Sequence, residues 1–196
     1  MGKTVDFYYD FVSSASYIAY KRLPELVDKA GGRINWKPML LGGVFKATGN
    51  QTPAAIPAKA VYMNSDLSRF AARYGVPLTF NPHFPINTLQ LMRGAVAEQM
   101  EGRLDAYLDL VFSAMWVEPK NLNDPAETGA LLKKGGYDAE GFLARISSEP
   151  VKNQLKANTE EAVSRGAFGA PTFFVGEAMF FGQDRLDFVE DALKTA

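Results

Sequence analysis

The feature that most constrains the fold of this sequence is a change of pattern along the chain: both ends mix strand and helix patterns, whereas the middle is helical. Residues 4–9 combine β-branched and aromatic residues, as a buried strand does. Apolar residues at spacings of three and four follow until residue 30, and residues 33–38 then alternate apolar with polar side chains. Because two strands joined by a helix run parallel, we expect the chain to open on a parallel strand pair.

The C-terminal part returns to the mixed pattern. Residues 172–175 and 178–181 are short apolar strands separated by Gly176-Glu177, a dipeptide typical of a type II′ hairpin turn. An amphipathic helix, which Asp184 is expected to cap, closes the chain. We therefore predict an α/β fold in which one discontinuous domain carries a helical insertion domain. The predicted boundaries are residues 1–41 and 151–196 for the discontinuous domain and 42–150 for the insertion.

Prolines and glycines give three local expectations. Pro24 lies inside the first helical pattern and lacks a backbone N–H, so it should bend the helix or start a new one. Gly42-Gly43 and residues 49–57 have the composition of loops. Pro171 follows Gly169-Ala170 at the start of a strand, which suggests a cis peptide bond or a tight turn.

The composition excludes several classes of site. The chain has no cysteine and a single histidine, His83, so it can form no disulfide, zinc–thiolate or multi-histidine metal site, and we predict no metal. A formal net charge of -1 offers no extended positive field for nucleic acid or an anionic membrane. No Gly-x-Gly-x-x-Gly follows the first strand, which argues against a dehydrogenase. Because no signal-peptide pattern precedes that strand, we expect a cytoplasmic protein.

Three short motifs contain residue types that can hold a small ligand. Ser13 and Ser16 lie between the first strand and the first helix, where a hydroxyl can cap the helix or donate a hydrogen bond to the sulfur of a bound thiol. The second motif is Gly169-Ala170-Pro171, where a proline enters a strand. Gln183-Asp184 precedes the last helix, where backbone amides and a carboxylate can hold the charged ends of an amino acid. Each motif also has a structural interpretation as a helix cap or a strand start.

These motifs belong to a series of segments whose order and spacing are informative together. The segments are residues 6–13, 48–50, 57–59, 62–63, 81–87, 151–156, 166–171 and 181–185. With them the chain resembles the 2-hydroxychromene-2-carboxylate isomerases and the kappa-class glutathione transferases, in the DsbA-like branch of the thioredoxin superfamily. The resemblance covers nearly the whole chain. It implies a thioredoxin-like fold with an all-helical insertion, and glutathione as the cofactor that supplies the missing thiol.

The same resemblance implies roles for individual residues. Ser13 is expected to act in catalysis by donating a hydrogen bond to the glutathione sulfur, and Ala170 is expected to pair its backbone with the cysteinyl part beside a cis Pro171. At Ser14-Ala15 the chain lacks the proline–aromatic pair usual in relatives, which should loosen the loop and enlarge the acceptor pocket. The other expected glutathione contacts are Asn50, Lys59, Gln183 and Asp184; the expected substrate contacts are Phe84, Asn87 and Trp116, the last of which could equally belong to the core.

The resemblance leaves three functions open. In a glutathione-dependent isomerase of aromatic compound catabolism, the thiolate adds to a conjugated carbon of 2-hydroxychromene-2-carboxylate, the ring opens, and glutathione leaves with trans-o-hydroxybenzylidenepyruvate as the product. In a glutathione transferase the same thiolate stays attached to an electrophile. A non-catalytic protein would only bind a peptide or glutathione beside the proline. A homodimer is expected because relatives commonly pair.

Overall fold

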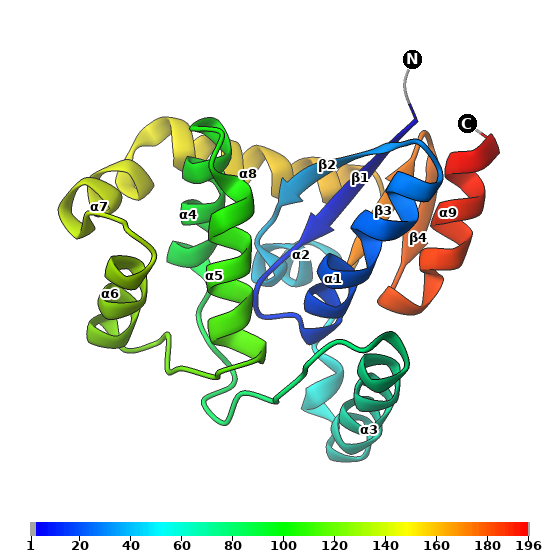
Figure 1. The fold of residues 1–196 in the computed structure, drawn as a ribbon, viewed down its shortest axis with the longest axis horizontal. Coiled ribbons are helices and arrows are strands. Elements are labelled where there is room, and N and C mark those ends of the chain that lie inside the picture. The colour runs from blue at the N-terminus through cyan, green and yellow to red at the C-terminus, as the bar shows by residue number, and fades with distance from the viewer. Residues whose placement is uncertain (1–2, 196) are drawn as a thin grey trace.

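The computed structural model describes residues 3–195, and a four-stranded sheet lies at its centre (Figure 1). Strand β1 (Thr4–Tyr9) pairs in parallel with β2 (Arg33–Pro38), which confirms the predicted parallel opening. Strand β3 (Thr172–Val175) runs antiparallel to β1 and forms a hairpin with β4 (Ala178–Phe181). Because the order across the sheet is β2-β1-β3-β4, residues from both ends of the chain build one sheet.

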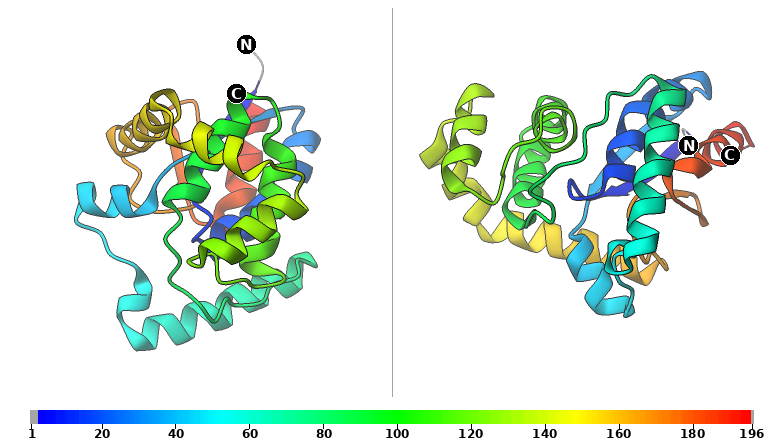
Figure 2. Two further views of the ribbon diagram at one scale, coloured as in Figure 1. Left: turned by 90° about the vertical axis from the view of Figure 1, so that its left-hand side faces the viewer. Right: turned by 90° about the horizontal axis from the view of Figure 1, so that it is seen from below.

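Helices cover both faces of this sheet. Helices α1 (Ser14–Lys29) and α9 (Leu186–Thr195) lie on one face, and α8 (Glu149–Ser164) runs behind the strands in Figure 1. The other helices lie beside and below the sheet (Figures 1 and 2) and are α2 (Leu41–Thr48), α3 (Pro57–Tyr74), α4 (Leu89–Met100), α5 (Leu104–Trp116), α6 (Pro125–Lys134) and α7 (Ala139–Ser147). The short 3-10 turns η1 (Pro53–Ala55) and η2 (Gln183–Arg185) precede α3 and α9. No helix between residues 3 and 195 is both long and apolar enough to cross a membrane.

Helix α1 continues through Pro24, so the expectation that this proline starts a new helix is wrong. A proline removes one helical hydrogen bond. That loss is local, whereas the helix is held mainly by the packing of its apolar face. Leu23, Leu26 and Val27 surround the proline on that face and are all buried.

Gly42-Gly43 is likewise not a loop but part of helix α2. A Cβ atom at Gly43 would lie 3.1 Å from the Thr159 Cγ2 atom of α8, so the small residue allows α2 to approach α8 closely. Val44 in the next position is fully buried. The glycine pair therefore serves helix packing. In the sequence alone, a Gly-Gly pair at a helix contact looks the same as a Gly-Gly pair in a loop.

The core between the sheet, α1 and α5 is aromatic. Phe112 of α5 is fully buried, and the centroid of its ring lies 4.7 Å from that of Phe11 and 4.9 Å from that of Tyr20. The rings of Tyr9 and Tyr17 lie 6.0 and 5.9 Å away. Such centroid distances are favourable for aromatic pairs. Helix α5 is thereby packed directly against the strand and helix that flank the motif at Ser13 and Ser16.

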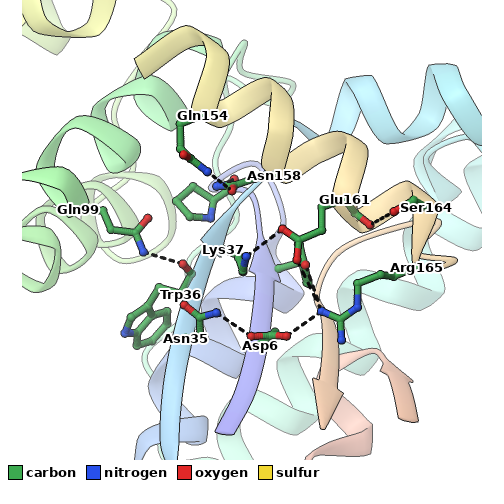
Figure 3. Close-up of polar contacts among 12 residues, drawn as sticks. Asp6, Asn35, Trp36, Lys37, Gln99, Gln154, Asn158, Glu161, Ser164 and Arg165 are labelled. Carbon is green, nitrogen blue, oxygen red and sulfur yellow. Dashed lines mark hydrogen bonds and ion pairs between the residues drawn. The ribbon is translucent and has the colours of Figure 1, made fainter. Parts of the chain in front are cut away.

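Side chains from the helices cover the free edge of β2, as Figure 3 shows. Gln99 of α4 donates its Nε2 to the carbonyl of Trp36 at 2.8 Å, and Asn158 of α8 donates its Nδ2 to the carbonyl of Pro38 at 3.0 Å. Lys37 of β2 also forms an ion pair with Glu161 of α8, at 2.8 Å. These contacts attach α8 to the sheet and bond backbone groups that an edge strand otherwise exposes.

The packing of α4 gives a prediction about its glycine. A Cβ atom at Gly94 would overlap the hydroxyl of Tyr107 and lie 2.8 Å from the Phe142 ring. We therefore expect Gly94→Ala to lower the free energy of unfolding by about 1–3 kcal/mol, although alanine is the better helix former. In the matched control Gly129→Ala, the added methyl group meets no atom of residues 3–195 within 4 Å beyond the neighbouring backbone of α6 itself. That variant should gain up to about 1 kcal/mol. Urea unfolding measures both, and equal effects would contradict the packing argument.

Candidate active site

Ser13 is the N-cap residue of α1 and occupies the centre of the first motif. Its Oγ accepts a hydrogen bond from the backbone N–H of Ser16 at 3.1 Å and donates one to the carbonyl of Ala170, also at 3.1 Å. The helix-cap interpretation is therefore confirmed, and it coexists with a direct link to the second motif. The N–H groups of Ser14 and Ala15 donate to no backbone or side-chain acceptor within residues 3–195. Such free N–H groups and the positive end of the helix dipole favour an anion.

The Ala170-Pro171 peptide bond is cis, as its sequence context suggests. The loop around it is held by hydrogen bonds from two further segments. The Nδ2 of Asn50 donates to the carbonyl of Phe168 at 2.8 Å, and the N–H of Gly182 donates to the carbonyl of Pro171 at 3.0 Å. Ser13, Asn50 and Gly182, which immediately precedes Gln183, therefore each donate a hydrogen bond to a carbonyl of this loop. Segments that lie more than a hundred residues apart in the sequence meet here.

Gln183 and Asp184 differ in their surroundings. Gln183 is buried, and its Oε1 atom finds no hydrogen-bond partner among the described residues. Asp184 is partly exposed and pairs with the guanidinium of Arg185. The expectation that Asp184 caps the last helix is wrong, because the 3-10 turn η2 precedes α9 and places Asp184 inside that turn.

Lys59 lies apart from these contacts. It is exposed in the first turn of α3, and within residues 3–195 it forms no hydrogen bond or ion pair with the loop at Ala170. Helix α3 packs against α1 and η1. The structure therefore leaves the predicted role of Lys59 without a direct contact to the other candidate residues.

The expected substrate residues lie around a second cis peptide bond, between Phe84 and Pro85. The Phe84 side chain is 42% exposed, and its ring centroid lies 6.4 Å from that of Trp116. Trp116 itself is only 2% exposed and donates its indole N–H to the carbonyl of Phe11 at 2.8 Å, which places it in the core. Asn87 is exposed and its Oδ1 accepts the N–H of Leu89 at 3.1 Å. At this place Phe84, and not Trp116, presents aromatic surface.

His83 is exposed in the same loop. Its backbone N–H donates to the Oδ1 of Asn81 at 2.9 Å, and Asn81 in turn donates its Nδ2 to the carbonyls of Met115 and Lys120. The loop is therefore fixed to the end of α5 through Asn81. This arrangement uses the backbone of His83, whose ring forms no hydrogen bond or ion pair among residues 3–195.

Asp10 is bonded to the loop that carries Ser13, although the sequence motifs do not single it out. It is 1% exposed, and its carboxylate accepts hydrogen bonds from the backbone N–H groups of Val12 and Leu41 and from the hydroxyl of Thr88. Burial raises the pKa of this carboxyl above its usual value, and the three hydrogen bonds act in the opposite direction. The available signal was a single acidic residue between the apolar Tyr9 and Phe11, where a charge is costly unless it has partners.

Comparison with known proteins identifies the family. The DSBA-like thioredoxin domain family matches residues 4–194. A 2-hydroxychromene-2-carboxylate isomerase of Sphingobium xenophagum is 32% identical over 98% of this chain and 99% of its own length. The chain belongs to the DSBA-like thioredoxin family and, within it, to the 2-hydroxychromene-2-carboxylate isomerase group. The predicted thioredoxin-like fold is thereby confirmed.

Further relatives agree with this placement. A 2-hydroxychromene-2-carboxylate isomerase of Pseudomonas putida is 34% identical over 96% of this chain and 93% of its own length, and human glutathione S-transferase kappa 1 is 29% identical over 97% and 91%. The solved structure of a 2-hydroxychromene-2-carboxylate isomerase superposes with a TM-score of 0.86 at 32% identity, covering 98% of this chain and 95% of that one. A probable DsbA oxidoreductase of Streptomyces coelicolor, 19% identical with a TM-score of 0.76, covers 98% and 89% and shares the fold.

Proposed function

We propose that this protein is a glutathione-dependent isomerase that converts 2-hydroxychromene-2-carboxylate into trans-o-hydroxybenzylidenepyruvate. The observation that carries the proposal is the position of the Ser13 hydroxyl. It lies at the N-terminus of α1 and is bonded to the residue before the cis Pro171, in a chain that has no thiol of its own. Membership of the isomerase group supports the choice of substrate.

The residues of the site fit glutathione by their chemistry. Ser13 and the free N–H groups of Ser14 and Ala15 provide donors for a thiolate. The unpaired, buried Oε1 of Gln183 provides an acceptor for the N–H groups of the γ-glutamyl end. We assign Asp184 with Gln183 to the γ-glutamyl end, Lys59 to the glycine end, and Asn50 to a further contact with the tripeptide.

Ser13 must exchange hydrogen-bond partners to take part. A hydroxyl has one proton, and in this structure Ser13 donates it to the carbonyl of Ala170. When Ser13 donates to sulfur instead, that carbonyl is released and can accept the N–H of the cysteinyl residue. A donor aimed at sulfur stabilises the thiolate and lowers the thiol pKa. Ser13 and Ala170 therefore act together on the sulfur and on the backbone that carries it.

The reaction needs a positioned thiolate and the opening of the substrate ring. When bound, glutathione would supply the thiolate, which can add to a conjugated carbon of the substrate. The ring C–O bond breaks as the proton of the hemiketal hydroxyl passes to the phenol oxygen, the former double bond can rotate as a single bond, and departure of the thiolate would re-form the double bond in the trans configuration. Phe84 and Asn87 orient the aromatic acid on the other side of the site. We further propose that the protein acts in aromatic compound catabolism, forms a homodimer and is located in the cytoplasm.

The proposal predicts turnover with a catalytic amount of glutathione. With 2-hydroxychromene-2-carboxylate in large excess over glutathione, we expect many molecules of the trans product per molecule of glutathione and recovery of free glutathione, followed by ultraviolet absorbance and mass spectrometry. A heat-inactivated sample is the control for spontaneous isomerisation. If product formation instead stops at one equivalent per glutathione and a conjugate accumulates, the protein is a transferase and the isomerase proposal fails.

A further inference from the structure

The Asp10 carboxylate is the most deeply buried charged group next to the candidate site. Its Oδ1 accepts hydrogen bonds from the N–H of Val12 at 3.1 Å and from the hydroxyl of Thr88 at 2.6 Å, and its Oδ2 accepts one from the N–H of Leu41 at 2.8 Å. Within residues 3–195, no lysine or arginine forms an ion pair or a hydrogen bond with this carboxylate. A buried carboxylate without a cation is costly, so hydrogen bonds must offset its desolvation.

The three donors come from three segments that carry different candidate residues. Val12 immediately precedes Ser13 in the loop between β1 and α1. Leu41 begins α2, and Asn50 follows shortly after the end of that helix. Thr88 ends the loop that contains Phe84 and Asn87. One carboxylate thus connects the loop of the thiol donor, the helix that leads to Asn50, and the loop assigned to the substrate.

The capping of two helices supports this connection. Thr88 is the N-cap residue of α4, but its hydroxyl makes no capping bond to that helix and donates to Asp10 instead. The Oδ1 of Asn87 accepts the N–H of Leu89, the first residue of α4. At α2 the N-cap residue is Leu40, which has no side-chain oxygen, and the Asp10 carboxylate accepts the first helical N–H from a distance of 31 residues. Threonine is a common N-cap because its hydroxyl serves its own helix, so its use elsewhere indicates a different task.

We propose that Asp10 is a positioning residue that fixes the substrate-facing loop at residues 84–88 relative to Ser13 and the glutathione sulfur. The assignment rests on the proposed function, because the two loops need a fixed separation only if a thiol on one must reach an acceptor on the other. Asp10 is buried and touches neither reactant. It acts through Thr88 on one side and through Val12 on the other. A small displacement of reacting groups is enough to slow a reaction strongly.

The test separates the Asp10–Thr88 link from general stability. Thr88→Val removes the hydroxyl and keeps the shape, and Thr88→Ser keeps the hydroxyl. The matched control Tyr107→Phe also removes one buried hydroxyl, which donates to the carbonyl of Leu91 at 3.0 Å, away from Asp10. Three quantities are measured for each variant: amide hydrogen exchange of residues 84–88 without glutathione, the dissociation constant of glutathione by calorimetry, and kcat and KM for the chromene carboxylate.

Thr88→Val is expected to raise hydrogen exchange in residues 84–88 and to lower kcat/KM about 10-fold, with glutathione affinity changed less than about 2-fold. Thr88→Ser should restore both, and Tyr107→Phe should change neither. If Thr88→Val matches Tyr107→Phe in exchange and in kinetics, the positioning role is refuted. If the wild-type protein binds no glutathione, the proposed function fails, and the exchange comparison still decides whether Asp10 holds this loop.

A second variant tests Asp10 directly. Asp10→Asn replaces one carboxylate oxygen by an amide nitrogen, which cannot accept a hydrogen bond. Either Leu41 or the pair of Val12 and Thr88 then loses its acceptor. We expect faster exchange at residues 41–44 or at residues 84–88, together with a lower kcat. Unchanged exchange at both segments would overturn the proposal.

Discussion

Replacing Ser13 by alanine is expected to lower kcat/KM for the chromene carboxylate by about 10- to 100-fold, because a hydrogen bond to a charged group contributes about 1.5–3 kcal/mol. The hydroxyl of Ser13 is the side-chain donor that we assign to the sulfur, and Ala cannot replace it. The N–H groups of Ser14 and Ala15 remain and provide the residual activity. Steady-state kinetics at saturating glutathione measure the loss.

Ser13 also caps α1, so the variant needs a control for stability. Asp138→Ala removes an equivalent cap, since the Asp138 carboxylate accepts the N–H of Gly141 at 2.7 Å at the start of α7. Both variants should lose about 1 kcal/mol of unfolding free energy. Only Ser13→Ala should lose activity. Full activity in Ser13→Ala, or an equal loss in both variants, would contradict the role of this hydroxyl.

Replacing Phe112 by alanine is expected to lower the free energy of unfolding by about 3–5 kcal/mol, the usual cost of removing a large buried aromatic side chain. Phe112 is fully buried between four other rings of β1, α1 and the loop that joins them, so its removal leaves a cavity that these rings cannot fill without losing their own contacts. Guanidinium unfolding followed by circular dichroism measures the change.

The matched control is Phe188→Ala on α9, where the side chain is 59% exposed. Its removal should change the free energy of unfolding by less than about 0.5 kcal/mol, as at other surface positions. If Phe112→Ala lowers the free energy of unfolding by less than about 1 kcal/mol, the surrounding residues can collapse into the space of the missing ring. The aromatic packing would then not be what holds α5 against the sheet.

Local patterns predict much of this fold. Three local patterns predict the sheet: the alternation in residues 33–38, the apolar strands after Pro171 and the turn at Gly176-Glu177. In the structure Gly176 has a positive φ and Glu177 does not, as a type II′ turn requires. The errors occur where tertiary contacts override a local rule. Pro24 lies in a helix held by its buried face, and Gly43 allows a close approach to α8.

The candidate site was accessible to sequence reasoning in part. Ser13, Ala170 and Pro171 are predicted as candidates because a helix start and a strand-initial proline carry recognisable chemistry, and the structure joins Ser13 to Ala170 by a hydrogen bond. No motif points to Asp10, because its donors lie 2, 31 and 78 residues away. Such separations along the sequence follow no helix or strand period, and these residues meet only in the folded chain. The core position of Trp116 likewise depends on a bond to Phe11, 105 residues away.

The most direct test of the account is an ultraviolet titration of the glutathione thiolate in complex with the wild-type protein and with Ser13→Ala. The account predicts that the thiol pKa falls from the ordinary value of about 8.5 to below about 7.5 in the wild-type complex and rises again in the variant. A thiol pKa that is the same in the wild-type complex as in free glutathione would contradict it.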